Sequence, residues 1–195
     1  MTLGRVSSEP EDPRRAARWV SRLPAGLHDR TLPLAAVLGV CVGLGVYVFE
    51  WIVDVLLHEV RAAPVGLMVL GPGLGLVLAT LAIRWGPAPR SRSTADEYLE
   101  SVHDPGHRIP VRQVAARMAA AVGTLGLGGS LGLEGPSVLL GAGAADTLAR
   151  RTARRMIVDH QALLVAGAAA AVAAVFKAPA TGAVFALEVP YRKDM

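Results

Sequence analysis

The sequence contains little charge, few aromatic residues and a single cysteine. Charged residues make up 18% of the 195 positions, whereas an average soluble domain carries about a quarter. Aromatic residues make up only 5%, while 52% of the chain is hydrophobic. This hydropathy excludes a typical soluble globule and also a disordered chain. Because Cys41 has no second cysteine to pair with, an internal disulfide is excluded as well.

The sequence also lacks the common catalytic and nucleic-acid-binding patterns. It has no Walker motif, dinucleotide fingerprint or Ser/His/Asp set, so we expect neither an enzyme nor a cofactor. His103 and His107 flank a turn without a third ligand at metal-site spacing, and we interpret both as loop histidines without a metal. The net charge of +4 comes from arginines grouped between apolar runs. That grouping is typical of cytoplasmic loops rather than of a nucleic-acid surface.

Glycine and alanine are abundant, with 21 glycines in the chain. Small residues let helices approach closely in a bilayer, so we predict an all-α, polytopic membrane protein. Residues 31–49 and 62–83 carry no charge, and each run is long enough to span the hydrocarbon core. The first pattern continues through Glu50 and Asp54 as a long tilted helix. The second contains Gly71-Pro72-Gly73, which predicts a kink.

The arginine clusters predict the topology and the domain boundaries. Clusters at residues 14–22, 84–92 and 150–155 place these segments in the cytoplasm. We therefore expect a multi-pass protein of the cell membrane, plasma or inner, with a cytoplasmic N-terminus. Residues 1–30 form a basic N-terminal segment, either an amphipathic surface helix or a solvated tail. Residues 31–195 form the transmembrane domain.

Several later segments are too short or too polar to cross a bilayer. Residues 93–104 are polar, with Ser93 or Thr94 as the helix cap, and predict either a surface helix or a half-helix buried against its neighbours. Residues 118–133 and the apolar stretches after them are interrupted by glycine or proline. Broken helices are tolerated at membrane depth where they line a site, so these breaks point to one.

The segment with the clearest chemical signal is residues 132–137. Pro136 suits the first turn of a helix, and Gly132 and Gly135 let the backbone bend close to a ligand. We predict a helix from near Gly135 to about Leu148. Its first N–H groups and the positive end of its dipole would form an anion site inside the membrane.

Glu134 lies at the mouth of this predicted anion site. When charged, its carboxylate can occupy the place of an anion, and when protonated it can swing away. A glutamate that caps its own helix is the alternative. We favour a gating role because an ionisable residue between apolar runs is rarely kept without a function.

The segment Gly132-Leu133-Glu134-Gly135-Pro136 resembles the G-(K/R)-E-G-P signature of the CLC family of chloride channels and chloride/proton exchangers. The flanking sequences resemble the family too, and the likeness extends over most of residues 31–195. The flanking sequences that resemble the family are Gly123-Thr124-Leu125-Gly126, Ala166-Gly167-Ala168-Ala169-Ala170, Ala178-Pro179-x-x-Gly182 and Phe185-x-x-Glu188. The resemblance implies the first inverted repeat of a CLC-like fold and movement of chloride across the membrane.

The resemblance also implies roles for individual residues of the signature. Glu134 matches the family's external gating glutamate. The backbone amides of Leu133, Glu134 and Gly135 match those around the outer anion site, with Gly132 and Pro136 in support. Leu133 stands where family members usually have a basic residue, so we expect weaker attraction of anions to the outer mouth.

Two further family positions are altered in this sequence. Only Ser93 matches the family's G-S-G-I-P motif, with Thr94 as an alternative hydroxyl, and Asp96 adds a negative charge nearby. Selectivity between chloride and fluoride therefore stays open. Val189 stands where exchangers carry an internal glutamate that relays protons. That substitution favours channel-like movement over proton coupling.

CLC proteins contain a second inverted repeat with a G-x-F-x-P loop and a tyrosine, and this sequence contains neither; Tyr191 is wrongly placed. A complete pore would need such a C-terminal repeat or a partner chain. The resemblance further implies a homodimer surrounded by membrane lipid, with no nucleic acid. The alternatives are a truncated, non-transporting membrane scaffold or one half of a split transporter.

Overall fold

The computed structural model describes residues 25–86, 93–104, 106–153 and 158–189, and within these residues every regular element is a helix. The predicted all-α class is thus confirmed. The basic stretch at 1–24, arginines 90, 92, 154 and 155, and Tyr191 lie outside the described residues. The helices are α2 (Ala25–Ala62), α3 (Val65–Trp85), α4 (Thr94–His103), α5 (Val111–Gly126), α6 (Glu134–Thr152), α7 (His160–Phe176) and α8 (Pro179–Glu188).

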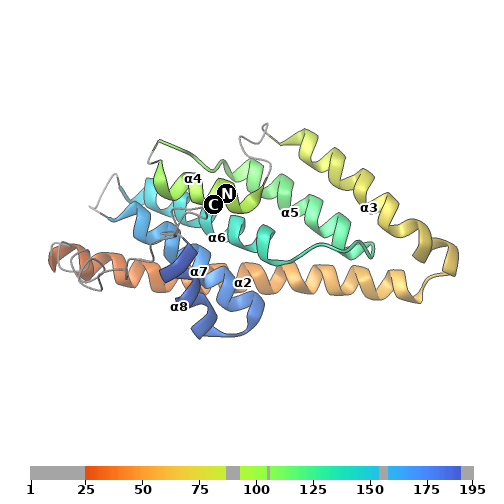
Figure 1. Cartoon of the computed structure of the whole chain (residues 1–195), viewed down its shortest axis with the longest axis horizontal. Helices are drawn as coiled ribbons and strands as arrows, with labels where there is room; N and C mark the ends of the chain where they lie inside the picture. The colour runs from red at the N-terminus through yellow and green to blue at the C-terminus, as the bar shows by residue number, and fades with distance from the viewer. Residues whose placement is uncertain (1–24, 87–92, 105, 154–157, 190–195) are drawn as a thin grey trace, which may run out of the picture.

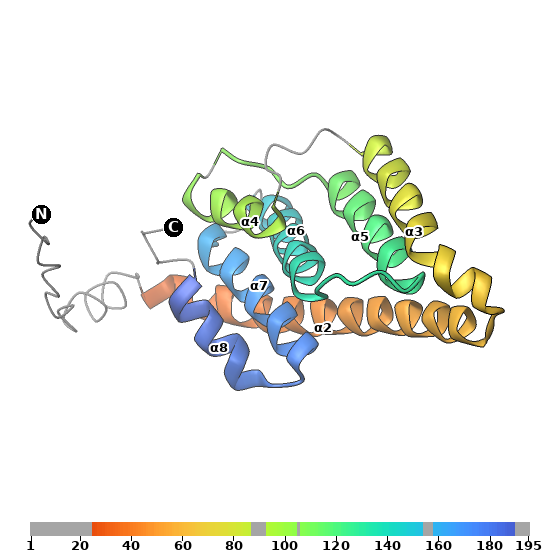
Figure 2. The ribbon, with the colours of Figure 1, turned by 45° about the vertical axis from the view of Figure 1, so that its right-hand side comes forward.

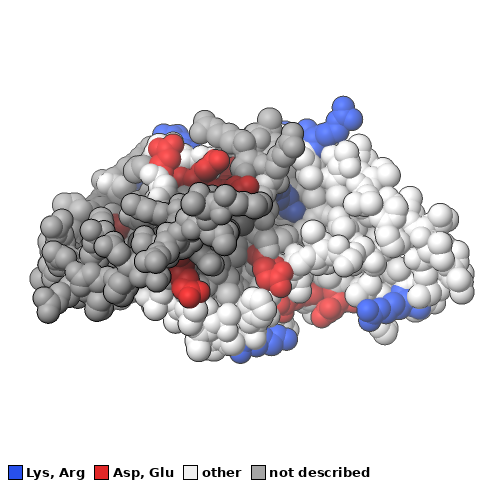
Figure 3. Space-filling model, in the orientation of Figure 1, with Lys and Arg blue, Asp and Glu red and all other residues white. Residues whose placement is uncertain are grey.

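Helix α2 runs along the long axis of the molecule and continues through Glu50 and Asp54, as predicted (Figure 1). Its buried side chains recur every three or four residues, which is the period of one helix face. They are Leu38, Val42, Val46, Phe49 and Val53, with Val60 two turns further on. The other face exposes large apolar side chains, including Val40 and Trp51. In the space-filling view, the surface over α3 is largely uncharged (Figure 3).

Two helices among the described residues are long and apolar enough to cross a membrane, α2 from Thr31 onward and α3. Pro64 precedes α3 and ends the short connection from α2. Pro72 lies inside α3, which continues through Gly71-Pro72-Gly73 as one helix. The neighbouring glycine Gly75 has a packing role, because a Cβ atom there would lie 2.6 Å from the carbonyl oxygen of Gly123 on α5.

Helices α6 and α7 pack side by side at the centre, and α8 folds back along α7 (Figure 2). The pairing depends on Gly141 and Gly167, since a Cβ atom on either would collide with the carbonyl oxygen of the other. Similarly, a Cβ atom on Gly182 of α8 would lie 2.5 Å from the carbonyl oxygen of Ala169 on α7. Close approach through small residues is the packing mode of membrane helices.

The structure extends two helices beyond what the apolar runs indicate. Helix α5 begins at Val111, before the uncharged run that starts at residue 118, and ends at Gly126, because Gly128 turns the chain with a φ of 87°. Helix α6 begins at Glu134 and extends beyond Leu148 to Thr152. Polar side chains after an apolar run hide helix length when only hydropathy is read.

For residues 93–104, the structure decides between the two alternatives. Helix α4 is a short half-helix buried against its neighbours, with Glu97, Tyr98 and Ser101 almost fully buried. His107 lies in the loop between α4 and α5, as predicted, although its side chain is only 3% exposed. The interpretation of His103 as a loop histidine is wrong, because it is the last residue of α4, and its Nδ1 lies 2.9 Å from the carbonyl oxygen of Leu99.

Candidate anion site

The N-terminus of α6 carries unused backbone donors. Leu133 occupies the N-cap position without a side-chain cap, and its carbonyl oxygen accepts the N–H of Ser137 at 3.2 Å. Helix geometry leaves the first N–H groups, here those of Glu134 and Gly135, without an acceptor in the helix. Pro136 has no N–H to satisfy. This end of α6 therefore offers donors and the positive end of the helix dipole.

The carboxylate of Glu134 lies beside Gly132. A Cβ atom on Gly132 would collide with the Oε2 atom of Glu134, so only glycine leaves room for this placement. The Glu134 side chain is exposed, not enclosed by protein. It bends back over the chain that leads into its own helix.

A second helix begins at the same place. The hydroxyl oxygen of Thr94, the first residue of α4, lies 2.7 Å from where a Cβ atom of Gly135 would be. Two positive helix ends thus meet, and each adds about half a unit of positive charge. Asp96, in the first turn of α4, is exposed. The convergence of two such ends favours a negatively charged occupant between them.

Of the two hydroxyls considered at α4, the structure brings Thr94 to α6. Ser93 lies one residue before the helix and is partly buried, and its carbonyl oxygen accepts the N–H of Glu97 at 3.3 Å. Neighbouring side chains on a helix point in directions about 100° apart. A gap-free alignment to a short motif does not contain this direction, so it could not decide between the adjacent hydroxyls of Ser93 and Thr94.

Ser137 is a site residue that sequence reasoning missed. It lies in the first turn of α6, is fully buried, and its Oγ has no hydrogen-bond partner among the described residues. A buried hydroxyl normally finds a partner. A hydroxyl directly after Gly-Pro at a helix start was the signal in the sequence that could have indicated it.

A buried ion network holds α4 in position. Glu97 is 1% exposed, and its Oε2 accepts a hydrogen bond from Nη2 of Arg117 on α5 at 3.3 Å. Nε2 of His107 lies 3.5 Å from the other oxygen of Glu97, and Nδ1 lies 3.7 Å from Oε2 of Glu100. A buried carboxylate needs such partners. These contacts join α4 to the start of α5.

A second buried carboxylate, Asp146, ties the other end of α6 to the neighbouring segments. Its Oδ1 accepts from Nε of Arg150 at 2.8 Å and lies 2.9 Å from Nε2 of His160 on α7. Its Oδ2 accepts the backbone N–H of Ile109 at 3.3 Å. Arg150 also donates to the carbonyl oxygen of His107 at 2.6 Å. Long-range contacts of this kind leave no trace in sequence spacing.

The break that separates α7 from α8 occurs where the sequence predicts it. Lys177 has a φ of 52°, and α8 begins at Pro179. At the other end of α8, Val189 packs against the hydrophobic core and is partly buried. Phe185, one turn earlier, faces Tyr98 of α4 with ring centroids 5.8 Å apart. Helix α8 therefore ends close to α4.

Residues 74–195, which include α4 through α8, match the protein family described as voltage gated chloride channel. The chain belongs to this family. Together with the apolar helices, this membership makes it a membrane protein. The family consists of channels and transporters rather than enzymes, which agrees with the lack of catalytic motifs.

Two relatives give the extent of the similarity. A ClcB-like chloride channel protein of Ralstonia nicotianae is 35% identical over 139 residues, or 70% of this chain. A chloride/fluoride channel protein of Pseudomonas syringae pv. tomato is 36% identical over 91 residues, or 47% of this chain. The matched stretches cover 32% of the first relative and 20% of the second. The chain therefore spans at most about a third of the length of either protein.

Proposed function

We propose that this chain contributes one half of an anion pathway across the membrane, with Glu134 as its gate. The observation that carries the proposal is the convergence of the α4 and α6 N-termini at Thr94 and Gly135. Two helix ends of the same sign meet in a chain of the chloride channel family. An anion placed there compensates both helix dipoles at once.

The backbone amides of Leu133, Glu134 and Gly135 are the donors that we assign to the anion. Thr94 and Ser93 supply the hydroxyl side of the site from α4. Gly132 and Pro136 act by shaping the approach, Gly132 through the room it leaves for the Glu134 carboxylate. A charged carboxylate next to the amides competes with the anion for the same donors. A protonated one loses this attraction, and the anion then passes.

The pathway needs ligands from a second repeat or from a partner chain. In transporters built from inverted repeats, the site lies between the repeats. Helix-end amides facing hydrocarbon would each cost several kcal/mol, about the price of any unsatisfied polar group in lipid. We propose that the functional unit is a homodimer of complete transport units in the cell membrane, with the N-terminus in the cytoplasm.

We propose channel-like movement of chloride, with fluoride as an alternative anion. Val189 directly follows α8, where a proton-relaying carboxylate would be needed for coupling, and an aliphatic side chain cannot carry a proton. The relative of Pseudomonas syringae pv. tomato is named for both chloride and fluoride. Asp96 adds negative charge beside α4 and disfavours tight anion binding there.

The experiment compares wild type with Glu134→Gln in proteoliposomes that contain the complete assembly. Chloride and fluoride efflux are measured across a pH series, with proton uptake recorded in parallel. The substitution keeps the shape of the side chain and removes its charge, so efflux should rise and lose its dependence on external pH. Glu134→Asp is the matched control, since its shorter carboxylate stays charged but is displaced from the amides.

Two results would contradict the proposal. Unchanged rate and pH profile in Glu134→Gln would make Glu134 a helix cap only. Stoichiometric proton uptake with anion efflux in the wild type would contradict the channel-like role of Val189. A second function, a non-transporting membrane scaffold, is favoured by the exposed Asp96 in the first turn of α4. It predicts no anion flux from the complete assembly at any pH.

A further inference from the structure

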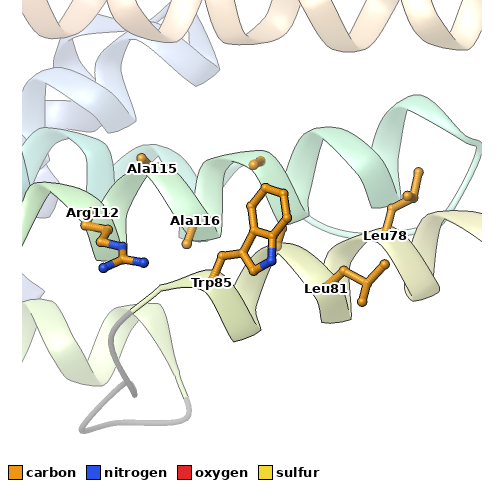
Figure 4. Close-up of a pocket in the computed structure, with 8 residues that line it drawn as sticks. Leu78, Leu81, Trp85, Arg112, Ala115 and Ala116 are labelled. Atoms are coloured by element: carbon orange, nitrogen blue, oxygen red, sulfur yellow. The ribbon is translucent and has the colours of Figure 1, made fainter.

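A groove lies on the outer side of the α3–α5 pair, away from the candidate anion site. Its volume is about 520 Å³. The α3 side chains that line it include Leu78, Leu81 and Trp85, and the α5 side includes Arg112, Ala116 and Ala119. Figure 4 shows Arg112 at one end, Leu78 toward the other, and Trp85 between them. Apart from Arg112, the lining is apolar or aromatic.

The two helices fix which end of the groove lies at the membrane surface. Helix α3 has 21 residues and is apolar enough to span the bilayer, so its last residue, Trp85, lies at the level of the headgroups. The next residue, Gly86, packs against the start of α5, with its Cβ position 2.8 Å from Cβ of Ala116. Arg112 precedes Ala116 by one turn, so it lies about one turn beyond Trp85, toward the membrane surface.

Arg112 is an exposed cation at that level. Within the described part of the chain, no carboxylate forms an ion pair with it. From Trp85 to Leu78 the groove extends about 10 Å into the hydrocarbon region along α3, at 1.5 Å per residue. Alanines form its floor on α5, and Leu81 and Trp85 form its α3 wall. An apolar groove with a cation at its surface end is complementary to an acyl chain joined to an anionic headgroup.

We propose that the α3–α5 groove binds an acidic phospholipid, with the phosphate against Arg112 and an acyl chain along Leu81 and Ala119. Trp85 lies between headgroup and chain, the position that indole side chains prefer in membranes. The binding free energy comes from the attraction between Arg112 and the headgroup and from burial of one acyl chain. Lipids with the same acyl chains are therefore distinguished by the charge of their headgroups.

The test uses the complete assembly in mild detergent and native mass spectrometry. Phosphatidylglycerol and phosphatidylcholine with identical acyl chains are titrated separately. Phosphatidylglycerol should bind more tightly. Arg112→Gln should weaken that binding about fivefold, the effect of one basic residue near an anionic surface, and should leave phosphatidylcholine binding unchanged.

Matched variants separate the groove from general surface charge. Arg84 lies in the last turn of the same helix and is exposed but does not line the groove, so Arg84→Gln should change binding less than twofold. Ala119→Phe fills the groove and should abolish binding of both lipids while leaving the circular dichroism spectrum intact. Glycerol phosphate alone should not compete, because it has no acyl chain.

Three outcomes would overturn the proposal. Equal affinity for the two lipids would remove the role of headgroup charge. Equal losses in Arg84→Gln and Arg112→Gln would mean diffuse surface attraction. If Ala119→Phe dissociates the assembly and the wild type retains no lipid, the groove is covered by protein instead. None of these outcomes depends on anion flux, so the proposal stands or fails separately from the function proposed for Glu134.

Discussion

The hydroxyl oxygen of Thr94 lies 2.7 Å from the point where a Cβ atom of Gly135 would be, and this contact joins the first turns of α4 and α6. The two residues are far apart in sequence and belong to different helices. Their contact leaves no space for a side chain at position 135. The distance between the two helix ends, and with it the shape of the candidate anion site, depends on position 135 being a glycine without a Cβ atom.

Substitution of Gly135 by alanine should separate the two helix ends. The added Cβ atom clashes with the Thr94 hydroxyl, and overpacking of this kind costs about 1–3 kcal/mol. The double variant Gly135→Ala/Thr94→Ala removes the hydroxyl and should recover most of that stability. The free energy of unfolding in detergent, measured for both single variants and the double variant, gives the coupling energy. Purely additive losses would contradict the contact.

Substitution of Gly132 by alanine should displace the gate without changing its charge. A Cβ atom there collides with Oε2 of Glu134, so the carboxylate must leave its present position. We expect anion efflux from the complete assembly to change its dependence on external pH, while Glu134→Gln/Gly132→Ala should behave like Glu134→Gln alone. Efflux would be recorded in proteoliposomes. A Gly132→Ala profile that matches wild type would mean that the carboxylate does not act from this place.

The 195-residue chain by itself should not conduct anions. Half a site leaves the α4 and α6 amides without ligands from the other half, and hydrocarbon cannot replace them. The purified chain would be reconstituted in liposomes, and chloride efflux measured beside liposomes without protein. Efflux well above that background would mean that copies of the chain assemble into a pore, and the argument from an incomplete site would fail.

The arginine clusters should all face the cytoplasm. In a Cys41→Ser background, cysteines at positions 21, 91 and 152 should resist an impermeant thiol reagent applied to intact cells. A cysteine at Ala62, where α2 ends, should react, and it serves as the matched positive control. The physical reason is the retention of arginine-rich loops on the cytoplasmic side. External labelling at position 91 would contradict the two-span interpretation of residues 31–83.

The α6–α7 pair should tolerate no side chain at its crossing point. Gly167→Ala places a Cβ atom against the carbonyl oxygen of Gly141, where only backbone movement can relieve the collision. We expect a loss of about 2 kcal/mol or more in the free energy of unfolding. Gly43→Ala on α2 is the matched control, because nothing lies within 4 Å of its Cβ position. Unfolding by denaturant in detergent would compare the two variants.

Local patterns in the sequence were enough to predict the fold class, the long helices and the start of α6. Hydrophobic runs and glycine or proline breaks are local signals, so they predicted the continuation of α2 through Glu50 and the break before Pro179. The same local chemistry identified Glu134 and its neighbours as a candidate anion site. Their functional roles stay predictions, since sequence and geometry describe a site but not flux through it.

The contacts between residues of different helices became known from the folded chain. It selected Thr94 beside Gly135, buried His107 between two glutamates, and revealed the unpartnered hydroxyl of Ser137 among the described residues. It also brought Asp146 to His160 and to the segment before α5. Contacts between helices depend on crossing geometry and on the absence of single Cβ atoms, which a one-dimensional pattern does not encode. Hydropathy shows which segments are excluded from water, whereas helix packing determines which residues are in contact.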